Sequence, residues 1–376
     1  MRKQLLGTTT LATLGILACG LTAGEAKAAD PISIEVGGFF MSVFQYIDQS
    51  DTTDLREFDL QTSGEMQFKG STTLDNGLAV GVRIEYEAHN QGGGGTIVDE
   101  RYLYLEGGFG QIKLGSDDNA AYSMHYQAPV AAWAVGLNTP SFAGLSGDGN
   151  AASSFISTYP FAGGDGNKII YFSPRFSGVQ LGASYQPDGN TSEGPQFNGT
   201  PNNDLGQQAE ILSFGANYSM AFDSVDVSAS FGYTYSEPER DHDGGVRDLG
   251  IDDDREAFVL GLTFAFEGIA IGVAYKDDDN GGKHADTTVL DLGITYSTGP
   301  WVVGFNYGHL EQEVPNLAGA KLGEDELDGY AFTAQYSMGP GINVIAAIKY
   351  YDYDSDRVGV SEPDGAVVAL GMAVSF

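Results

Sequence analysis

Apolar and polar residues alternate along most of this 376-residue chain, in short runs separated by polar or glycine-rich connections. Neighbouring residues of a β-strand point to opposite faces of the sheet, so a period of two predicts strands with one apolar face. Stretches with the period of a helix are almost absent. The pattern predicts sixteen strands, at 32–46, 65–70, 78–88, 100–106, 111–115, 167–172, 179–185, 210–220, 225–235, 255–266, 269–275, 287–297, 301–311, 327–338, 342–353 and 366–376.

The connections between these strands alternate in length. Seven are tight turns that carry the Gly, Pro, Asn or Asp typical of hairpins, at 74–77, 107–110, 173–178, 221–224, 266–268, 297–300 and 337–341. The other eight are longer and polar, and the longest spans residues 116–166. Short turns at one end and long loops at the other are the rule in transmembrane barrels and have no reason in a soluble sandwich.

The pattern of the last predicted strand indicates that its apolar face contacts lipid. In VVALGMAVSF, the large apolar side chains take every second position and the chain stops on Phe376. Aromatic residues also gather near strand ends, as interfacial girdles of membrane barrels do; they are Tyr296, Trp301, Phe264, Phe266, Tyr350, Tyr351 and Tyr353. The sequence therefore predicts an all-β fold, a transmembrane antiparallel barrel of sixteen strands whose outer face meets lipid.

The first 29 residues have the features of a secretory signal peptide. Arg2 and Lys3 precede an apolar run, and Ala26-Lys27-Ala28-Ala29 offers a cleavage site after Ala28 or Ala29. A membrane anchor and a lipoprotein leader ending at Cys19 are the alternatives. We expect an exported protein with one barrel domain over residues 30–376.

Charge and cysteine content narrow the function further. The leader carries three basic residues and one acid, so its removal changes the formal charge from −33 to −35. Nucleic acid requires a basic surface, and it is excluded as a partner. The only cysteine, Cys19, leaves with the leader, so the exported chain contains no disulfide.

Two stretches resemble the general porin family of Gram-negative bacteria, particularly its sixteen-stranded trimeric members: GEMQFKGSTTLDNGLAVGVRIEYEA (64–88) and ERYLYLEGGFGQIKLG (100–115). The terminal Phe376 resembles the signal that the barrel-insertion machinery reads in that family. The resemblance implies a homotrimer in the outer membrane, in contact with lipid and lipopolysaccharide. It also implies that the third loop, 116–166, folds into the pore and narrows it.

The same resemblance assigns residues to the pore. Arg101 matches a wall arginine, Lys69 and Lys113 match basic lumen positions, and Glu65 stands where the family often has another arginine. Arg83 and Glu85 fall on the polar face of their strand. With the acids of the third loop, the predicted pore lining is Glu65, Lys69, Arg83, Glu85, Arg101, Lys113, Asp117, Asp118 and Asp148. Which of these charges lie at the narrowest point stays open.

The function implied is a channel for passive diffusion of small hydrophilic solutes and ions, mildly cation-selective because the loops at 241–254 and 276–286 are rich in aspartate. Two alternatives remain. One is a sugar-type selective channel with an aromatic track at Tyr122, Tyr126, Trp133 and Phe142; the other is a structural or adhesive barrel that acts through its acidic loops. The five histidines lie in different segments and form no catalytic pattern, so neither an enzyme nor a cofactor is expected. Ca²⁺ at the acidic external loops stays open.

Overall fold

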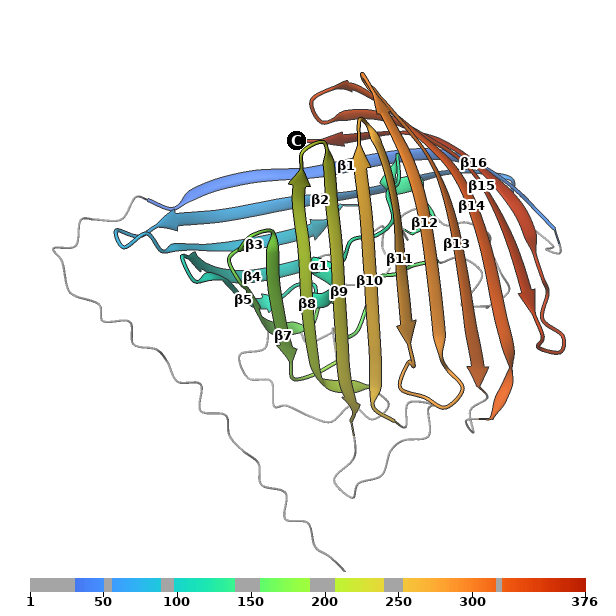
Figure 1. The fold of residues 1–376 in the computed structure, drawn as a ribbon, viewed down its shortest axis with the longest axis horizontal. Coiled ribbons are helices and arrows are strands. Elements are labelled where there is room, and N and C mark those ends of the chain that lie inside the picture. Colours follow the sequence, from blue (N-terminus) through green and yellow to red (C-terminus); the bar gives the residue numbers. More distant parts are fainter. Residues whose placement is uncertain are drawn as a thin grey trace, which may run out of the picture.

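A computed structural model describes residues 31–50, 56–88, 98–138, 156–189, 207–239, 253–315 and 320–376. It contains sixteen strands, and every strand predicted from the sequence is present (Figure 1). Their bounds are β1 Ser33–Gln49, β2 Phe58–Thr73, β3 Ala79–Glu87, β4 Val98–Gly107, β5 Gly110–Ser116, β6 Asn167–Phe172, β7 Val179–Gln186, β8 Gln208–Phe222, β9 Val225–Pro238, β10 Arg255–Phe266, β11 Ile269–Asp278, β12 Thr287–Thr298, β13 Trp301–Pro315, β14 Lys321–Gly339, β15 Ile342–Ser355 and β16 Asp364–Ser375.

The strands form one closed antiparallel barrel in which each strand pairs with its neighbours in sequence. The first and last strands close it, with a register that runs from Phe39 opposite Ser375 to Gln49 opposite Gly365. Beyond β16, the N–H of Phe376 donates to the carbonyl oxygen of Gly38 (3.0 Å), and the Gly38 N–H donates back to Phe376 (3.1 Å). Closure leaves no sheet edge unpaired, as a strand fold in lipid requires.

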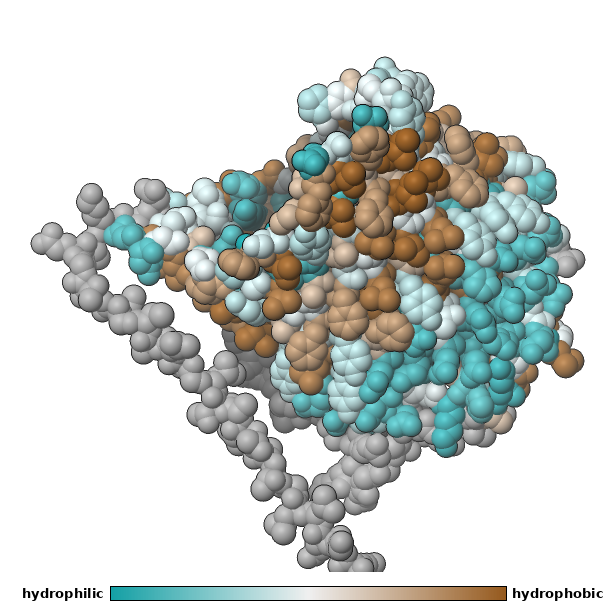
Figure 2. Space-filling view, in the orientation of Figure 1, coloured by the Kyte–Doolittle hydropathy of each residue, from teal (hydrophilic) through white to brown (hydrophobic). Residues whose placement is uncertain are grey.

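The outer face of the barrel is apolar. On β10, for example, Phe258, Leu260, Leu262, Phe264 and Phe266 are exposed, whereas Ala257 and Val259 face inward and are buried. Figure 2 shows the result as a broad hydrophobic band over the strands, bounded by hydrophilic residues toward the long loops. The period-two pattern in the sequence therefore separates a lipid-facing surface from the barrel interior.

Outward aromatic pairs occur near both ends of the strands. Trp301 packs on Tyr336 near the short turns, with ring centroids 4.7 Å apart, and Tyr46 packs on Phe58 near the long loops, at 4.9 Å. One part of the aromatic prediction is wrong. Tyr351 and Tyr353 are buried on the inner face, because only every second residue of β15 can point outward.

Several strands extend beyond the predicted bounds at the end with the long loops. β2 and β14 begin seven and six residues earlier than predicted, at Phe58 and Lys321. The added residues are mainly polar, and they pair with β1 and β13, with one register shift between Val314 and Pro315 of β13. Hydropathy alone marks only the part of each strand that crosses the apolar band.

Among the described residues, none of the helices is both long and apolar enough to cross a membrane. The predicted leader, residues 1–29, lies outside the described residues, as does most of the acidic loop at 241–254.

The third loop, residues 117–166, contains helix α1 (Ala120–Met124) and the 3₁₀ turn η1 (Trp133–Val135). Helix α1 lies inside the barrel and contacts β6, β7, β8 and β9 (Figure 1). We call residues 117–138 the outgoing arm and residues 156–166 the return arm; both are described. The described arms of the third loop therefore lie against the inner wall of the barrel.

Candidate functional site: the pore interior

The neck of the third loop is tied together by buried polar groups. Lys168 on β6 donates from Nζ to the carbonyl oxygen of Asp117, where the outgoing arm starts, and to that of Gly164 at the end of the return arm (2.8 Å). The Ser116 hydroxyl donates to the carbonyl oxygen of Asp165. Lys168 is only 5% exposed. Sequence patterns did not single it out, because one lysine in NKIIYF resembles any lumen charge.

Two asparagines hold the arms against each other. The Asn119 side chain accepts from the N–H of Tyr122 (2.9 Å), which caps α1. It also donates to the carbonyl oxygens of Pro160 (2.8 Å) and Ala162 (3.2 Å) in the return arm. Asn138 donates to the hydroxyl of Thr158 (2.7 Å) and accepts from its N–H (3.1 Å).

Aromatic rings fill the space between the arms. The Tyr122 ring lies 4.5 Å from that of Tyr159 and 5.4 Å from that of Phe161. The Tyr122 ring therefore packs the two arms of the loop together and is not free to contact a sugar in the pore. Tyr122 does not favour the sugar-channel alternative. Trp133 is 48% exposed, and Phe142 lies outside the described residues.

The described part of the third loop runs along the inner wall from strand to strand. Its side chains and backbone contact strands from β6 round to β15, and Ala132, Ala134 and Val135 pack in one cluster with Met41 and Val43 of β1. The strands β2, β3 and β4 lie outside this run of contacts, although Asp99 on β4 interacts with Asp165 of the return arm. We call the inner face of these three strands the uncovered wall. The predicted pore residues Glu65, Lys69, Arg83 and Glu85 lie there.

Acidic groups dominate this uncovered wall. Arg83 pairs with Glu85, while Gln67 donates to both Glu65 (2.5 Å) and Glu85 (3.4 Å). Lys113 on β5 places Nζ 2.5 Å from a carboxylate oxygen of Asp117 and 4.4 Å from the ring centroid of Tyr102. Arg83 and Lys113 therefore each have an acidic neighbour, and further acids remain on the wall.

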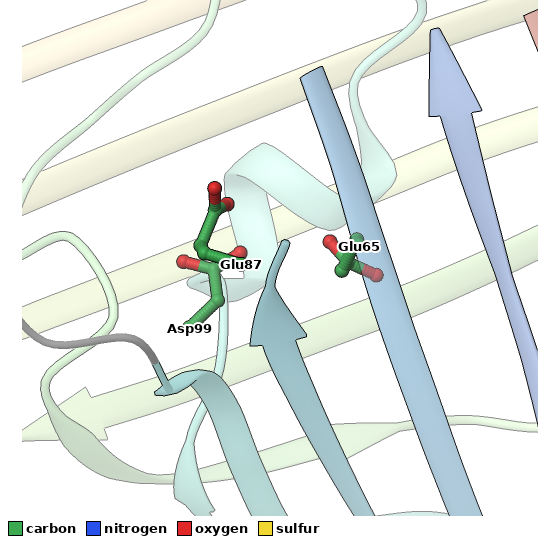
Figure 3. Close-up of side chains that lie close together, drawn as sticks. All are labelled: Glu65, Glu87 and Asp99. Atoms are coloured by element: carbon green, nitrogen blue, oxygen red, sulfur yellow. The ribbon is translucent and has the colours of Figure 1, made fainter. Parts of the chain in front are cut away.

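Three acids on the adjacent strands β2, β3 and β4 lie close together. Carboxylate oxygens of Glu65, Glu87 and Asp99 all lie within 4.8 Å of one another (Figure 3). Within the described ranges, this is the one group of three metal-ligating side chains close enough to share a cation. Three carboxylates in so small a volume produce a strongly negative local potential.

The acids in the neck of the loop have altered pKa values. Burial, with the neighbouring Asp165 and Asp117, raises the pKa of Asp118 to about 8. Burial also raises the pKa of Asp165. Burial lowers the pKa of His125 to about 4, so this ring is neutral at physiological pH, and Nε2 hydrogen-bonds the Thr158 hydroxyl (2.9 Å). Asp118 is therefore largely uncharged below pH 8 and negative above it.

One predicted pore residue points away from the lumen, and another lies inside it but away from the third loop. Arg101 pairs with Ile84 and alternates with the inward-facing Tyr102, so it lies on the outward face with Leu103, and its assignment to the lumen is wrong. Lys69 is inward but borders a hollow of about 620 Å³ toward the short turns, away from the third loop. Asp148 lies outside the described residues.

Glu100 takes the inward place that the sequence prediction gave to Arg101. It is largely buried and interacts electrostatically with Asp117, Glu85 and Lys113. The alternation in ERYLYLE contains the signal, because Arg101 shares its face with Leu103 and Leu105, and Glu100 shares its face with Tyr102 and Tyr104.

Similar solved structures share this architecture. A porin structure refined at 1.8 Å is 18% identical, with a TM-score of 0.57, and the match covers 92% of this chain and all of that one. OmpT of Vibrio cholerae, in a trimer form, is 15% identical with a TM-score of 0.60 and the same coverage. A mutant of the Rh. blastica porin is 15% identical with a TM-score of 0.54, again over 92% of this chain and all of that one. At these identities the likeness shows the fold alone.

No curated protein sequence is detectably similar to this chain. The family model for Gram-negative porins matches residues 11–356, which is most of its length. With a closed sixteen-strand barrel, an apolar outer band and a charged interior that holds the described arms of the third loop, the chain belongs to the Gram-negative porin family of outer-membrane channels.

Proposed function

We propose that this porin is a mildly cation-selective channel for passive diffusion of ions and small hydrophilic solutes. The observation that carries the proposal is the surplus of carboxylates on the uncovered wall and at the neck of the third loop. Eight acids accompany four basic residues there: Glu65, Glu85, Glu87, Asp99, Glu100, Asp117, Asp118 and Asp165, with Lys69, Arg83, Lys113 and Lys168. The acids remain in the majority when Asp118, which is largely uncharged below pH 8, is left out. A negative lumen concentrates cations and repels anions.

Recording from the purified protein in a planar bilayer under a KCl gradient tests this selectivity. The sign of the reversal potential should indicate a preference for cations. We expect a permeability ratio of K⁺ to Cl⁻ on the order of 3 to 10, greater in dilute salt where screening is weak. Glu65→Gln should lower this ratio. The matched control is Glu326→Gln, which removes the same charge from an exposed outward position on β14.

The same recordings can be repeated over a series of pH values. Because the pKa of Asp118 is raised to about 8, its proton leaves as the pH rises through that value, and the lumen gains negative charge. The cation preference should therefore increase from pH 6 to pH 9, at about the pH where Asp118 titrates, and the step should shrink in Asp118→Asn. Anion preference throughout would contradict the proposed selectivity, whereas absence of any conductance would contradict the channel itself.

We further propose that the protein assembles as a homotrimer through the wall of β5, β6 and β7. These strands have only seven, six and eight residues. A tilted strand needs about 9–11 residues to cross the apolar layer, so this wall is too short to face lipid. Its outward residues Leu114, Ile169 and Leu181 are nevertheless apolar and exposed in the single chain. A second copy of the barrel would cover them.

Cross-linking in native membranes tests this assembly. We expect products of two and three chain masses, and cysteines at Ile169 and Leu181 should cross-link between chains. Cysteines at Leu260 and Leu262, exposed outward positions on β10, are the matched controls and should face lipid. A single chain mass under all conditions would contradict the trimer.

A further inference from the structure

Polar side chains of the inner wall hold the backbone of the outgoing arm strand by strand. Hydroxyl oxygens accept from its N–H groups: Ser184 on β7 from Ala120 (3.1 Å), Ser213 on β8 from Ala121 (2.8 Å), Ser230 on β9 from Tyr126 (2.9 Å) and Thr333 on β14 from Ala131 (3.3 Å). Asn306 on β13 donates to the carbonyl oxygen of Pro129 (3.1 Å). The arm is therefore fixed to the wall along its length.

Glycine occupies the wall where the arm comes nearest. A β-carbon on Gly215 would lie 2.7 Å from the carbonyl oxygen of Ala120, and one on Gly232 would lie 2.8 Å from the β-carbon of Ala121. On β10 and β12, β-carbons at Gly261 and Gly293 would overlap the carbonyl oxygens of Tyr126 and Pro129. The colliding atoms at the last two positions belong to the backbone, so no side chain can turn away.

These glycines are not required by the conformation of their own backbone. None of Gly215, Gly232, Gly261 and Gly293 has a positive φ, so alanine fits the local chain geometry at each. Gly215 pairs with Gly232 across β8 and β9, so the space left by the missing side chains continues from one strand to the next. At Gly215, Gly261 and Gly293 the atom nearest to an added β-carbon belongs to the arm, so space for the arm is the physical reason for glycine there. At Gly232 the Val259 side chain on β10 is as near as Ala121 of the arm.

We propose that this seat of glycines and hydrogen-bonding side chains sets the width of the channel, by fixing how far the third loop stands from the wall. The inference rests on the proposed channel function and adds its size-determining residues. An arm held by bonds on β7, β8, β9, β13 and β14 has one way to accommodate a larger wall residue, which is to move toward the pore axis. Interiors are close-packed, so the wall itself yields little.

Gly261→Ala tests the proposal by single-channel recording. The added methyl group overlaps the Tyr126 carbonyl oxygen, the arm shifts inward, and the conductance should fall on the order of 1.5-fold, because the cross-section of a narrow pore changes steeply when one side moves. Gly339→Ala on β14 is the matched control, since a β-carbon there meets nothing within 4 Å. It should conduct like the wild type.

A second pair of variants covers the case in which Gly261→Ala fails to assemble. Ser230→Ala removes the bond to Tyr126 without adding volume, and the freed arm should make the open-channel current at least twice as noisy. Thr234→Val is its control on the same strand, because the Thr234 hydroxyl has no hydrogen-bond partner among the described residues. Wild-type conductance in Gly261→Ala, or equal noise in Ser230→Ala and Thr234→Val, would overturn the inference. A wild-type protein that does not conduct would instead overturn the channel function.

Discussion

Cells that produce Phe376→Asp should contain about tenfold less folded protein in the outer membrane than cells that produce the wild type. Phe376 is 62% exposed on the outer surface, and its backbone bonds to Gly38 close the barrel. A charged side chain near the membrane interface costs about 1 kcal/mol, which alone is too little for such a loss. The larger part comes from the insertion signal that the family resemblance assigns to this residue.

Two measurements separate these contributions. Refolding of the purified chain into detergent should be nearly normal for Phe376→Asp, because the machinery is then absent, while the amount in cells falls. Phe376→Tyr keeps an aromatic ring suited to the interface and should assemble normally. Val358→Asp, at a fully exposed loop residue, controls for the added charge. Normal cellular levels of folded Phe376→Asp would show that the terminal ring is not needed.

Lys168→Met should give a channel with about twice the open-channel current noise of the wild type and with frequent changes in conductance level. Lys168 joins the two ends of the third loop and is surrounded by Asp117, Asp118 and Asp165. Removing one partner of a buried charged network costs about 3–5 kcal/mol, because the remaining charges stay buried. The neck should open, while the backbone pairing of β5 with β6 keeps the barrel closed.

The unboiled protein should therefore still migrate as a folded barrel but unfold at a lower temperature on heating. Lys69→Met is the control, since Lys69 is an inward lysine that borders a hollow away from the neck. Lys168→Arg keeps the charge and should recover most of the wild-type behaviour. Steady current in Lys168→Met, equal to that of Lys69→Met, would contradict a role for Lys168 in holding the loop.

Alternation in the sequence was sufficient to predict the sixteen strands, because each crosses one apolar layer and must repeat with a period of two. The route of the third loop was not predictable in the same way. Its contacts with the wall depend on where Ser213 and Gly261 lie relative to each other in the closed barrel, and this follows from the strand registers. No local pattern in the sequence encodes those registers.

The error at Arg101 has a different origin. Matching single positions to a family placed it in the lumen, although its neighbours Leu103 and Leu105 share its face and are apolar. Periodicity within the strand was the better guide than position in a motif. Glu65, placed by the family match, and Glu85, placed by alternation, both lie on the inner wall.

The bonds of the outgoing arm also constrain the order of folding. Ala131 bonds to Thr333, 202 residues away, and Gly136 bonds to Lys349, 213 residues away. A chain that adds strands from either end lacks a partner of these bonds until β5, β14 and β15 are all in the sheet. Contacts so distant in sequence form late because their loop-closure entropy is large. Pairing of β1 with β16 then encloses the arm. The placement of the constriction therefore belongs to the last steps of barrel assembly.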